Sequence, residues 1–216
     1  MPKKYIATAM LALAALATTN AFAAPLSTYS DNALFNAAIS NAATDTYSTL
    51  TTGTSFSGPV TRTVGSYSYS VTTTDNILYQ GLSADGFLTN NNRTNPIVFS
   101  SFSGGATAIG ANFFGSLITG TYAPGLNLTL TINEFDGDVF TTSLNNTTRE
   151  SFFGYIGDSA ITGLSVTGLT TDFWPSIDNL TLAQLASNNV AEPESITLLG
   201  LALLGLGLSR RRTSTK

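Results

Sequence analysis

The chain has 216 residues, of which only 10% are charged, and this length suits one medium-sized domain with short appended segments. It contains no Cys and no His, which excludes disulfide frameworks, thiolate and imidazole metal sites, and catalysis by either side chain. Residues 24–190 carry three basic and eleven acidic side chains, a net charge of −8, so we expect no binding to nucleic acid.

Residues 1–23 have the three parts of a secretory signal peptide. Lys3 and Lys4 supply the positive start, residues 6–17 the apolar core, and Ala21 and Ala23 the small side chains of a cleavage site. The apolar core is too short to span ~30 Å of hydrocarbon. We therefore expect export through the Sec translocon, cleavage by signal peptidase, and a mature chain that begins at Ala24.

One short helix is predicted near the start of the mature domain. Ser30 is placed to cap it, Asp31 falls in its first turn, and Leu34 and Phe35 begin an apolar face. The helix should end near Asn41.

After the helix, apolar and polar residues alternate with a period of two, which is typical of half-buried β-strands. In the clearest row, residues 126–133, Leu or Ile alternates with Asn or Thr. Similar segments, separated by turns rich in Gly, cover residues 66–74, 97–102, 108–114, 139–144, 152–156, 161–166 and 177–183. The predicted fold is all-β: an antiparallel, jelly-roll-like β-sandwich over residues 24–186, with Thr129 and Thr131 facing outward.

Three carboxylates lie close together in the sequence, at Glu134, Asp136 and Asp138. Alternation along an extended segment can place all three on one face. We interpret residues 136–138 as a hairpin turn, because Asp and Gly favour the backbone conformations that turns need. Calcium binding and catalysis by paired carboxylates are the alternatives.

Trp174 is the only tryptophan of the chain, and we expect it in a loop before the last strand. A loop aromatic can stack on a sugar ring or can plug the end of the core. Both interpretations stay open for Trp174.

The C-terminal part divides into a linker, residues 187–194, and a hydrophobic tail, residues 195–216. The tail has an apolar run from Ile196 to Leu208, followed by Arg210, Arg211 and Arg212. Such a run makes a helix of about 20 Å, short for a stable membrane span. The arginines would stop transfer and hold their end at the cytoplasmic headgroups, so we expect transient anchoring in the inner membrane.

The sequence from Glu192 and Pro193 through the glycine-punctuated apolar run to the arginines resembles the PEP-CTERM sorting signal, with Ala191 where the first Pro of that motif usually stands. That signal occurs on exported bacterial surface proteins. The resemblance implies that an exosortase cuts the chain near Glu192-Pro193. It also implies delivery to the outer surface or extracellular matrix of a Gram-negative bacterium.

Residues 152–156 and 177–182 also resemble segments of the lectin-like jelly-roll domains that often precede this signal. This resemblance makes Asp178 a candidate ligand of a structural calcium ion. Alternatively, Asp178 closes a loop by accepting hydrogen bonds from backbone N–H groups. No other cofactor is expected.

Three functions are compatible with these patterns. The first is a non-catalytic surface or matrix protein associated with exopolysaccharide, which requires nothing that the sequence lacks. The second is a secreted glycan hydrolase that uses carboxylates alone. The third is an ice-binding protein that presents rows of Thr such as Thr129 and Thr131, although the sequence has no internal repeat.

Overall fold

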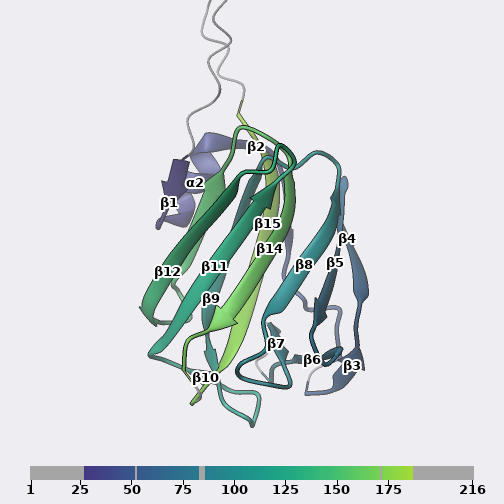
Figure 1. The fold of residues 1–216 in the computed structure, drawn as a ribbon, viewed down its shortest axis with the longest axis vertical. Coiled ribbons are helices and arrows are strands. Elements are labelled where there is room, and N and C mark those ends of the chain that lie inside the picture. The colour runs from purple at the N-terminus through teal and green to yellow at the C-terminus, as the bar shows by residue number, and fades with distance from the viewer. Residues whose placement is uncertain (1–26, 52, 83–85, 171, 187–216) are drawn as a thin grey trace, which may run out of the picture. The chain divides into compact units, whose positions relative to one another are not determined.

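The computed structural model describes residues 27–51, 53–82, 86–170 and 172–186, and these form two antiparallel β-sheets packed face to face (Figure 1). The predicted all-β sandwich is confirmed. The signal peptide, Ala24, Glu192, Pro193 and the arginine cluster lie outside the described residues, so their processing and anchoring stay predictions. No helix among the described residues has the length and apolar character that crossing a membrane requires.

The larger sheet has the strand order β1-β13-β9-β15-β7-β6-β3, with β10 beside β9 and β2 beside β15. Its strands are β1 (Ser27–Tyr29), β2 (Ile39–Asp45), β3 (Ser55–Ser57), β6 (Ile77–Gln80), β7 (Leu88–Asn90), β9 (Ala108–Ser116), β10 (Tyr122–Ala123), β13 (Phe152–Ile156) and β15 (Trp174–Leu185).

The smaller sheet has the order β12-β11-β14-β8-β5-β4. Its strands are β4 (Val60–Val64), β5 (Tyr67–Thr73), β8 (Ile97–Ser103), β11 (Leu126–Glu134), β12 (Val139–Thr147) and β14 (Ile161–Gly168). The alternating row of β11 behaves as predicted: its Leu and Ile side chains at 126, 128, 130 and 132 are buried. Thr129 and Thr131 are half-exposed on the outer face.

The core lies between the inner faces of the two sheets. Leu128 and Leu130 of β11 pack there with aromatic residues of both sheets, including Tyr69, Phe99 and Phe113. Each such side chain stabilises the fold by about 1.5–3 kcal/mol when it is fully buried. A smaller cluster around Phe35 joins helix α2 (Asn32–Ala38) to Phe152 of β13.

The helix differs from its prediction in cap, length and face. Asp31, not Ser30, is the N-cap, because its carboxylate accepts hydrogen bonds from the N–H groups of Ala33 and Leu34 at 2.7 and 3.0 Å. The helix ends at Ala38, where the chain turns extended to pair as β2 with β15. Leu34 is exposed, so the seven-residue helix buries Phe35 alone.

Strand β15 contains a bulge that preserves its buried face. Ile177 and Leu180 are both fully buried although three positions separate them, which strict alternation does not allow. The register against β9 shifts between Asp178 and Thr181, and Asn179 has φ of 54°. The extra residue at this bulge returns Leu180 to the core.

The registers assign the strand ends to two opposite ends of the sandwich. Trp174 pairs with Ser116 at one end, which we call the Trp174 end, and Ala183 pairs with Ala108 at the other. Ser27 pairs with Ile156 at this second end, which we call the terminal end because the described domain begins and finishes there. In Figure 1, β10 and β7 mark the Trp174 end, and α2 marks the terminal end.

Candidate functional site

The sequence predicted Trp174 in a loop before the last strand. In the structure it is instead the first residue of β15. Its indole N–H donates to the carbonyl of Asn91 at 3.1 Å. The guanidinium carbon of Arg93 lies 4.4 Å from the centroid of the ring, in a cation–π contact. The ring is half-exposed, so it is held in place by backbone, hydrogen bond and cation while part of its surface stays open.

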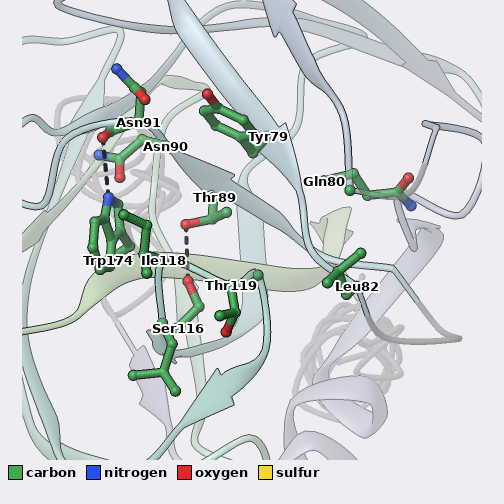
Figure 2. Close-up of a pocket in the computed structure, with 13 residues that line it drawn as sticks. Tyr79, Gln80, Leu82, Thr89, Asn90, Asn91, Ser116, Ile118, Thr119 and Trp174 are labelled. Carbon is green, nitrogen blue, oxygen red and sulfur yellow. Dashed lines mark hydrogen bonds between the residues drawn. The ribbon is translucent and has the colours of Figure 1, made fainter.

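A cavity of about 260 Å³ lies beside Trp174 (Figure 2). It is built from five chain segments: residues near Gly53, strand β6 with Leu82, strand β7 with Asn91, the end of β9 with the following loop, and the start of β15. The thirteen lining residues are uncharged: Gly53, Tyr79, Gln80, Leu82, Thr89, Asn90, Asn91, Ser116, Leu117, Ile118, Thr119, Gly120 and Trp174. Arg93 does not line the cavity.

A chain of buried hydroxyl groups underlies the cavity. Ser176 Oγ donates to Ser116 Oγ at 2.9 Å, and Thr89 Oγ1 donates to the carbonyl of Pro175 at 2.9 Å. Because the Thr89 proton is used in this way, the 3.2 Å contact between Ser116 and Thr89 has Ser116 as its donor. The chain ties β7, β9 and β15 together directly below Trp174.

Two buried amides also line the cavity, and each has an oxygen without a hydrogen-bond partner: Gln80 Oε1 and Asn90 Oδ1. Buried polar groups are paired in most structures, so such oxygens call for an explanation. Gln80 Nε2 donates to the carbonyl of Tyr47, and in Figure 2 its amide points away from the other lining side chains. Asn90 instead lines the cavity together with Trp174 and Ile118, on the other side of it from Gln80 in that view.

The rim of the cavity is apolar and exposed. Ile118 is 82% exposed, Leu82 53% and Leu117 42%. The rim is fixed by backbone bonds from Leu82 N to Gly120 O and from Leu117 N to Thr121 O, at 2.7 and 2.8 Å. Gly120 has φ of +76°, and a Cβ there would lie 3.3 Å from the Leu82 side chain, so this turn requires glycine.

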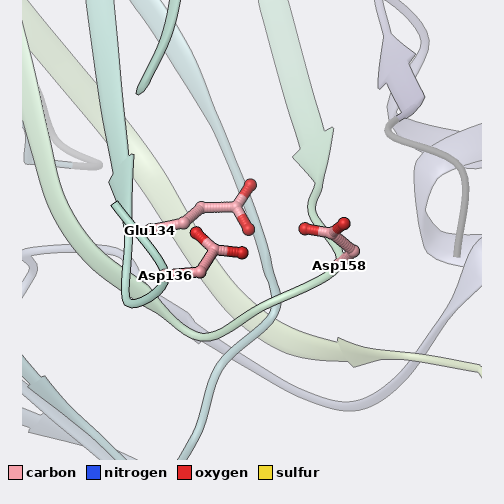
Figure 3. Close-up of side chains that lie close together, drawn as sticks. All are labelled: Glu134, Asp136 and Asp158. Atoms are coloured by element: carbon pink, nitrogen blue, oxygen red, sulfur yellow. The ribbon is translucent and has the colours of Figure 1, made fainter. Parts of the chain in front are cut away.

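The carboxylates of Glu134 and Asp136 come together as the sequence allowed, but their third partner is Asp158 and not Asp138 (Figure 3). One oxygen from each lies within 4.8 Å of the others. Asp136 also accepts from the N–H of Asp138 at 3.1 Å, which confirms the predicted turn. The cluster lies at the terminal end, since Ile161, the partner of Glu134, donates its N–H to the carbonyl of Ala106 just before β9 begins at Ala108.

Glu134 is already bonded within the protein. It is 4% exposed, it accepts a short hydrogen bond from the Tyr155 hydroxyl, and it accepts from the Ser159 N–H at 2.9 Å. Burial, and then the bond to Glu134, raise the pKa of Tyr155 well above its usual value, so Tyr155 stays protonated as the donor. Calcium takes six to eight oxygen ligands, of which these three carboxylates supply a part.

Asp178 lies at the β15 bulge, 4% exposed, and accepts from the N–H of Asn179 at 2.8 Å. Such a hydrogen bond from a backbone N–H group is the alternative to calcium binding that the sequence left open for Asp178. Asp178 does not belong to the carboxylate cluster. It lines a second groove of about 750 Å³, on the outer face of the larger sheet, together with Asn112, Arg149 and Glu150.

Sequence reasoning therefore found Trp174 and missed most of its surroundings. Tyr79, Asn90, Asn91 and Ile118 belong to segments that meet only in the fold. Asp158 lies between the predicted strands 152–156 and 161–166 and was not singled out as a carboxylate of the cluster. The signal that could have identified Asp158 is its position in the loop just before β14. Strand β14 pairs with β11, whose last residue is Glu134.

No protein-family model matches this chain, and no curated protein sequence matches it either.

Solved structures with a similar fold include TmCBM61 in complex with β-1,4-galactotriose, with 11% identity over 54% of this chain and 88% of that chain, at a TM-score of 0.36. The CBM22-1–CBM22-2 tandem domain of Paenibacillus barcinonensis Xyn10C has 16% identity over 69% of this chain and 47% of that chain, also at 0.36. The CBM22-1 xylan-binding domain of the same protein has 18% identity over 62% and 95%, at 0.30.

Proposed function

We propose that this chain is a non-catalytic surface protein whose β-sandwich binds an uncharged polysaccharide at the Trp174 cavity. The observation that carries the proposal is a half-exposed tryptophan, held by Asn91 and Arg93, at the wall of a cavity lined by amides and hydroxyls. A sugar ring presents C–H groups on its faces and hydroxyls on its edge. Aromatic side chains pack against the former, and amides bond the latter.

Rigid placement of these groups supports binding. The hydroxyl chain beneath the cavity and the β15–β9 pairing hold Trp174 before any ligand arrives. A preorganised site avoids the entropy that ordering of side chains on binding would cost. The exposed rim at Leu82 and Ile118 adds apolar surface that a ligand can cover.

The hydrolase alternative has less support. A retaining glycosidase pairs two carboxyls about 5 Å apart, and the Glu134 cluster has a similar spacing. However, Glu134 is buried and bonded to Tyr155 and Ser159, and the cluster lies at the end opposite the Trp174 cavity. None of the described residues that line that cavity carries a carboxylate.

Fluorescence of the purified protein tests the binding proposal, because Trp174 is its only tryptophan. Titration with uncharged polysaccharides, such as cellulose oligomers, xylan, galactan and mannan, should change its emission saturably with at least one of them. Alginate and polygalacturonate serve as anionic controls and should not bind to a domain of net charge −8. If no uncharged polysaccharide changes the emission or gives heat in calorimetry, the proposal fails.

We also propose that the chain is exported and sorted through its C-terminal tail by an exosortase, on the strength of the sequence pattern. The fold suits such tethering, because β15 ends at Leu185 on the terminal end while the cavity lies at the other. The strand of twelve residues separates the two by about 35 Å. The chain therefore leaves the described domain at the end opposite the cavity.

Two sets of variants test the sorting proposal in a host that carries the exosortase. Replacing Glu192 and Pro193 should leave the anchor intact and block cleavage, so uncleaved protein accumulates in the inner membrane. Neutral replacements of Arg210, Arg211 and Arg212 should instead let the tail pass or misorient, because each arginine costs ~2.5–3.5 kcal/mol at the bilayer centre. Normal processing of the Glu192/Pro193 variant would contradict exosortase sorting.

A further inference from the structure

The orientation of the Asn90 amide follows from its surroundings. Its Nδ2 donates to the carbonyl of Asn95 at 2.6 Å, and because a carbonyl only accepts, the nitrogen must be the atom that faces Asn95. The opposite atom, Oδ1, is therefore the one without a partner. Asn90 is 2% exposed and lines the Trp174 cavity, so this acceptor is buried at the cavity wall.

No described side chain donates to Asn90 Oδ1, and several polar groups beside the cavity already use their protons elsewhere. The protons of Ser176, Ser116 and Thr89 are used along the hydroxyl chain that ends on the carbonyl of Pro175. The side-chain amide of Asn91 is directed to Asp75, with 3.4 Å between Nδ2 and Oδ2. A group that completes the cavity must therefore bring a hydrogen-bond donor of its own.

The charge and the size of the cavity further restrict the class of ligand that it can bind. Although Arg93 stacks on Trp174, the described lining residues are uncharged and the surrounding domain is acidic, so an anionic group entering the cavity would meet net repulsion. A volume of about 260 Å³ lies just below the roughly 300–1,000 Å³ of typical small-molecule sites. This volume suits a single sugar residue inside the cavity, and any further residues of a chain would lie over the exposed rim.

We infer that the Trp174 cavity selects one uncharged sugar residue that packs on Trp174 and donates a hydroxyl hydrogen bond to Asn90 Oδ1. The inference rests on the proposed polysaccharide binding and assigns Asn90 as its specificity-determining residue. Sites that bond a ligand hydroxyl discriminate strongly against the analogue that lacks it, because the protein group is then left buried and unpaired.

The first experiment uses the wild-type protein. Glucose, galactose, mannose, xylose, N-acetylglucosamine, glucuronate and galacturonate, each as its methyl glycoside, are titrated by Trp174 fluorescence and calorimetry. One of the uncharged sugars should bind, and its disaccharide should gain no more than a few-fold in affinity. Among monodeoxy forms of that sugar, one should bind about 5- to 100-fold more weakly, which is the effect of leaving Asn90 Oδ1 unpaired.

The second experiment repeats the deoxy series on Asn90→Leu, which keeps the side-chain size and removes the acceptor. This variant should bind the parent sugar about 5- to 100-fold more weakly and should no longer distinguish the parent from the critical deoxy form. Asn92→Ala is the matched control. Asn92 accepts from Thr94 in the same loop but does not line the cavity, so the control should keep wild-type discrimination.

The outcomes separate the two proposals. If polysaccharide binds but Asn90→Leu retains wild-type affinity and discrimination, the assignment of Asn90 is wrong and the binding function stands. If Asn90→Leu does not fold, equal binding of every monodeoxy form by the wild type overturns the inference by itself. Tighter binding of a uronate than of any uncharged sugar, or binding of polymers with no binding of their monomers or dimers, also overturns it. No binding of any uncharged carbohydrate refutes both.

Discussion

Two buried polar regions of this domain differ in how completely the protein satisfies them. Around Asp45, both carboxylate oxygens accept two bonds each: Oδ1 from Tyr47 N and Arg62 Nη2, and Oδ2 from Arg62 Nε and Tyr69 OH. At the Trp174 cavity, Asn90 Oδ1 accepts none. The regions are neighbours, since Gln80 lines the cavity and donates to the carbonyl of Tyr47.

The difference indicates which region has a structural role and which a binding role. A buried ionic network with every acceptor filled leaves nothing for a ligand, and it fixes the strands that it joins. A cavity with an unpaired acceptor and a half-exposed aromatic ring gains hydrogen bonding and contact when a ligand enters. The Glu134 cluster resembles the Asp45 network in this respect, because Tyr155 and Ser159 already bond its buried carboxylate.

The largest expected effect is on stability, from Arg62→Ala. Removing one partner of a buried ion pair leaves Asp45 uncompensated and costs about 3–5 kcal/mol, or about 10 °C in Tm for a domain of this size. Thermal and urea unfolding measure this change. At a temperature where the variant is folded, its polysaccharide affinity should stay within about three-fold of wild type. A loss of affinity by the folded variant would show that the two regions are not separable.

The next largest effect is on binding, from Trp174→Ala. Truncating an aromatic residue at the centre of a site costs about 2 kcal/mol or more, which is about a 30-fold loss of affinity. Stability should fall by about 1–3 kcal/mol, because the partly buried ring also loses its bond to Asn91 and its contact with Arg93, so binding is measured where the variant is folded. Calorimetry is required, since the substitution removes the fluorophore. Trp174→Phe, which keeps a ring and loses the bond to Asn91, should fall between wild type and Ala.

Acid should reduce the contribution of the Asp45 network to the free energy of unfolding, whereas the described lining of the cavity has no such carboxylate to titrate. Burial alone raises the pKa of Asp45, but the hydrogen bonds from Arg62, Tyr47 N–H and Tyr69 outweigh it, so its pKa is lowered overall. A lowered folded pKa stabilises the protein above the unfolded value, about 3.9, and this stability is lost as the pH falls through the folded pKa. The stability difference between wild type and Asp45→Asn, measured by urea unfolding, should therefore be constant from pH 5 to 7 and shrink below about pH 4. A difference that grows on acidification would contradict this sign.

The sequence predicted the parts of the fold that follow from local alternation. The Leu and Ile row of β11 specified a strand with one buried face, and the single tryptophan drew attention to the correct end of β15. Strand β2 was missed because residues 39–45 show no alternating apolar row; pairing with β15 makes it a strand. Asn90 was missed because nothing local separates it from the asparagines beside it. Its role depends on five segments that only the sheet topology brings together.

The smallest expected effect is that of calcium on binding. The carboxylates weighed as calcium ligands, those of the Glu134 cluster and Asp178, do not line the Trp174 cavity, and the cluster lies at the opposite end of the sandwich. EDTA or millimolar calcium should therefore change polysaccharide affinity by less than about two-fold in a fluorescence titration. A rise in Tm with calcium at unchanged affinity would place a structural cation away from the cavity and sharpen the contrast between the two ends. A loss of affinity in EDTA would mean that the ligand is held through a cation, and the assignment of an uncharged, cation-free cavity would then be wrong.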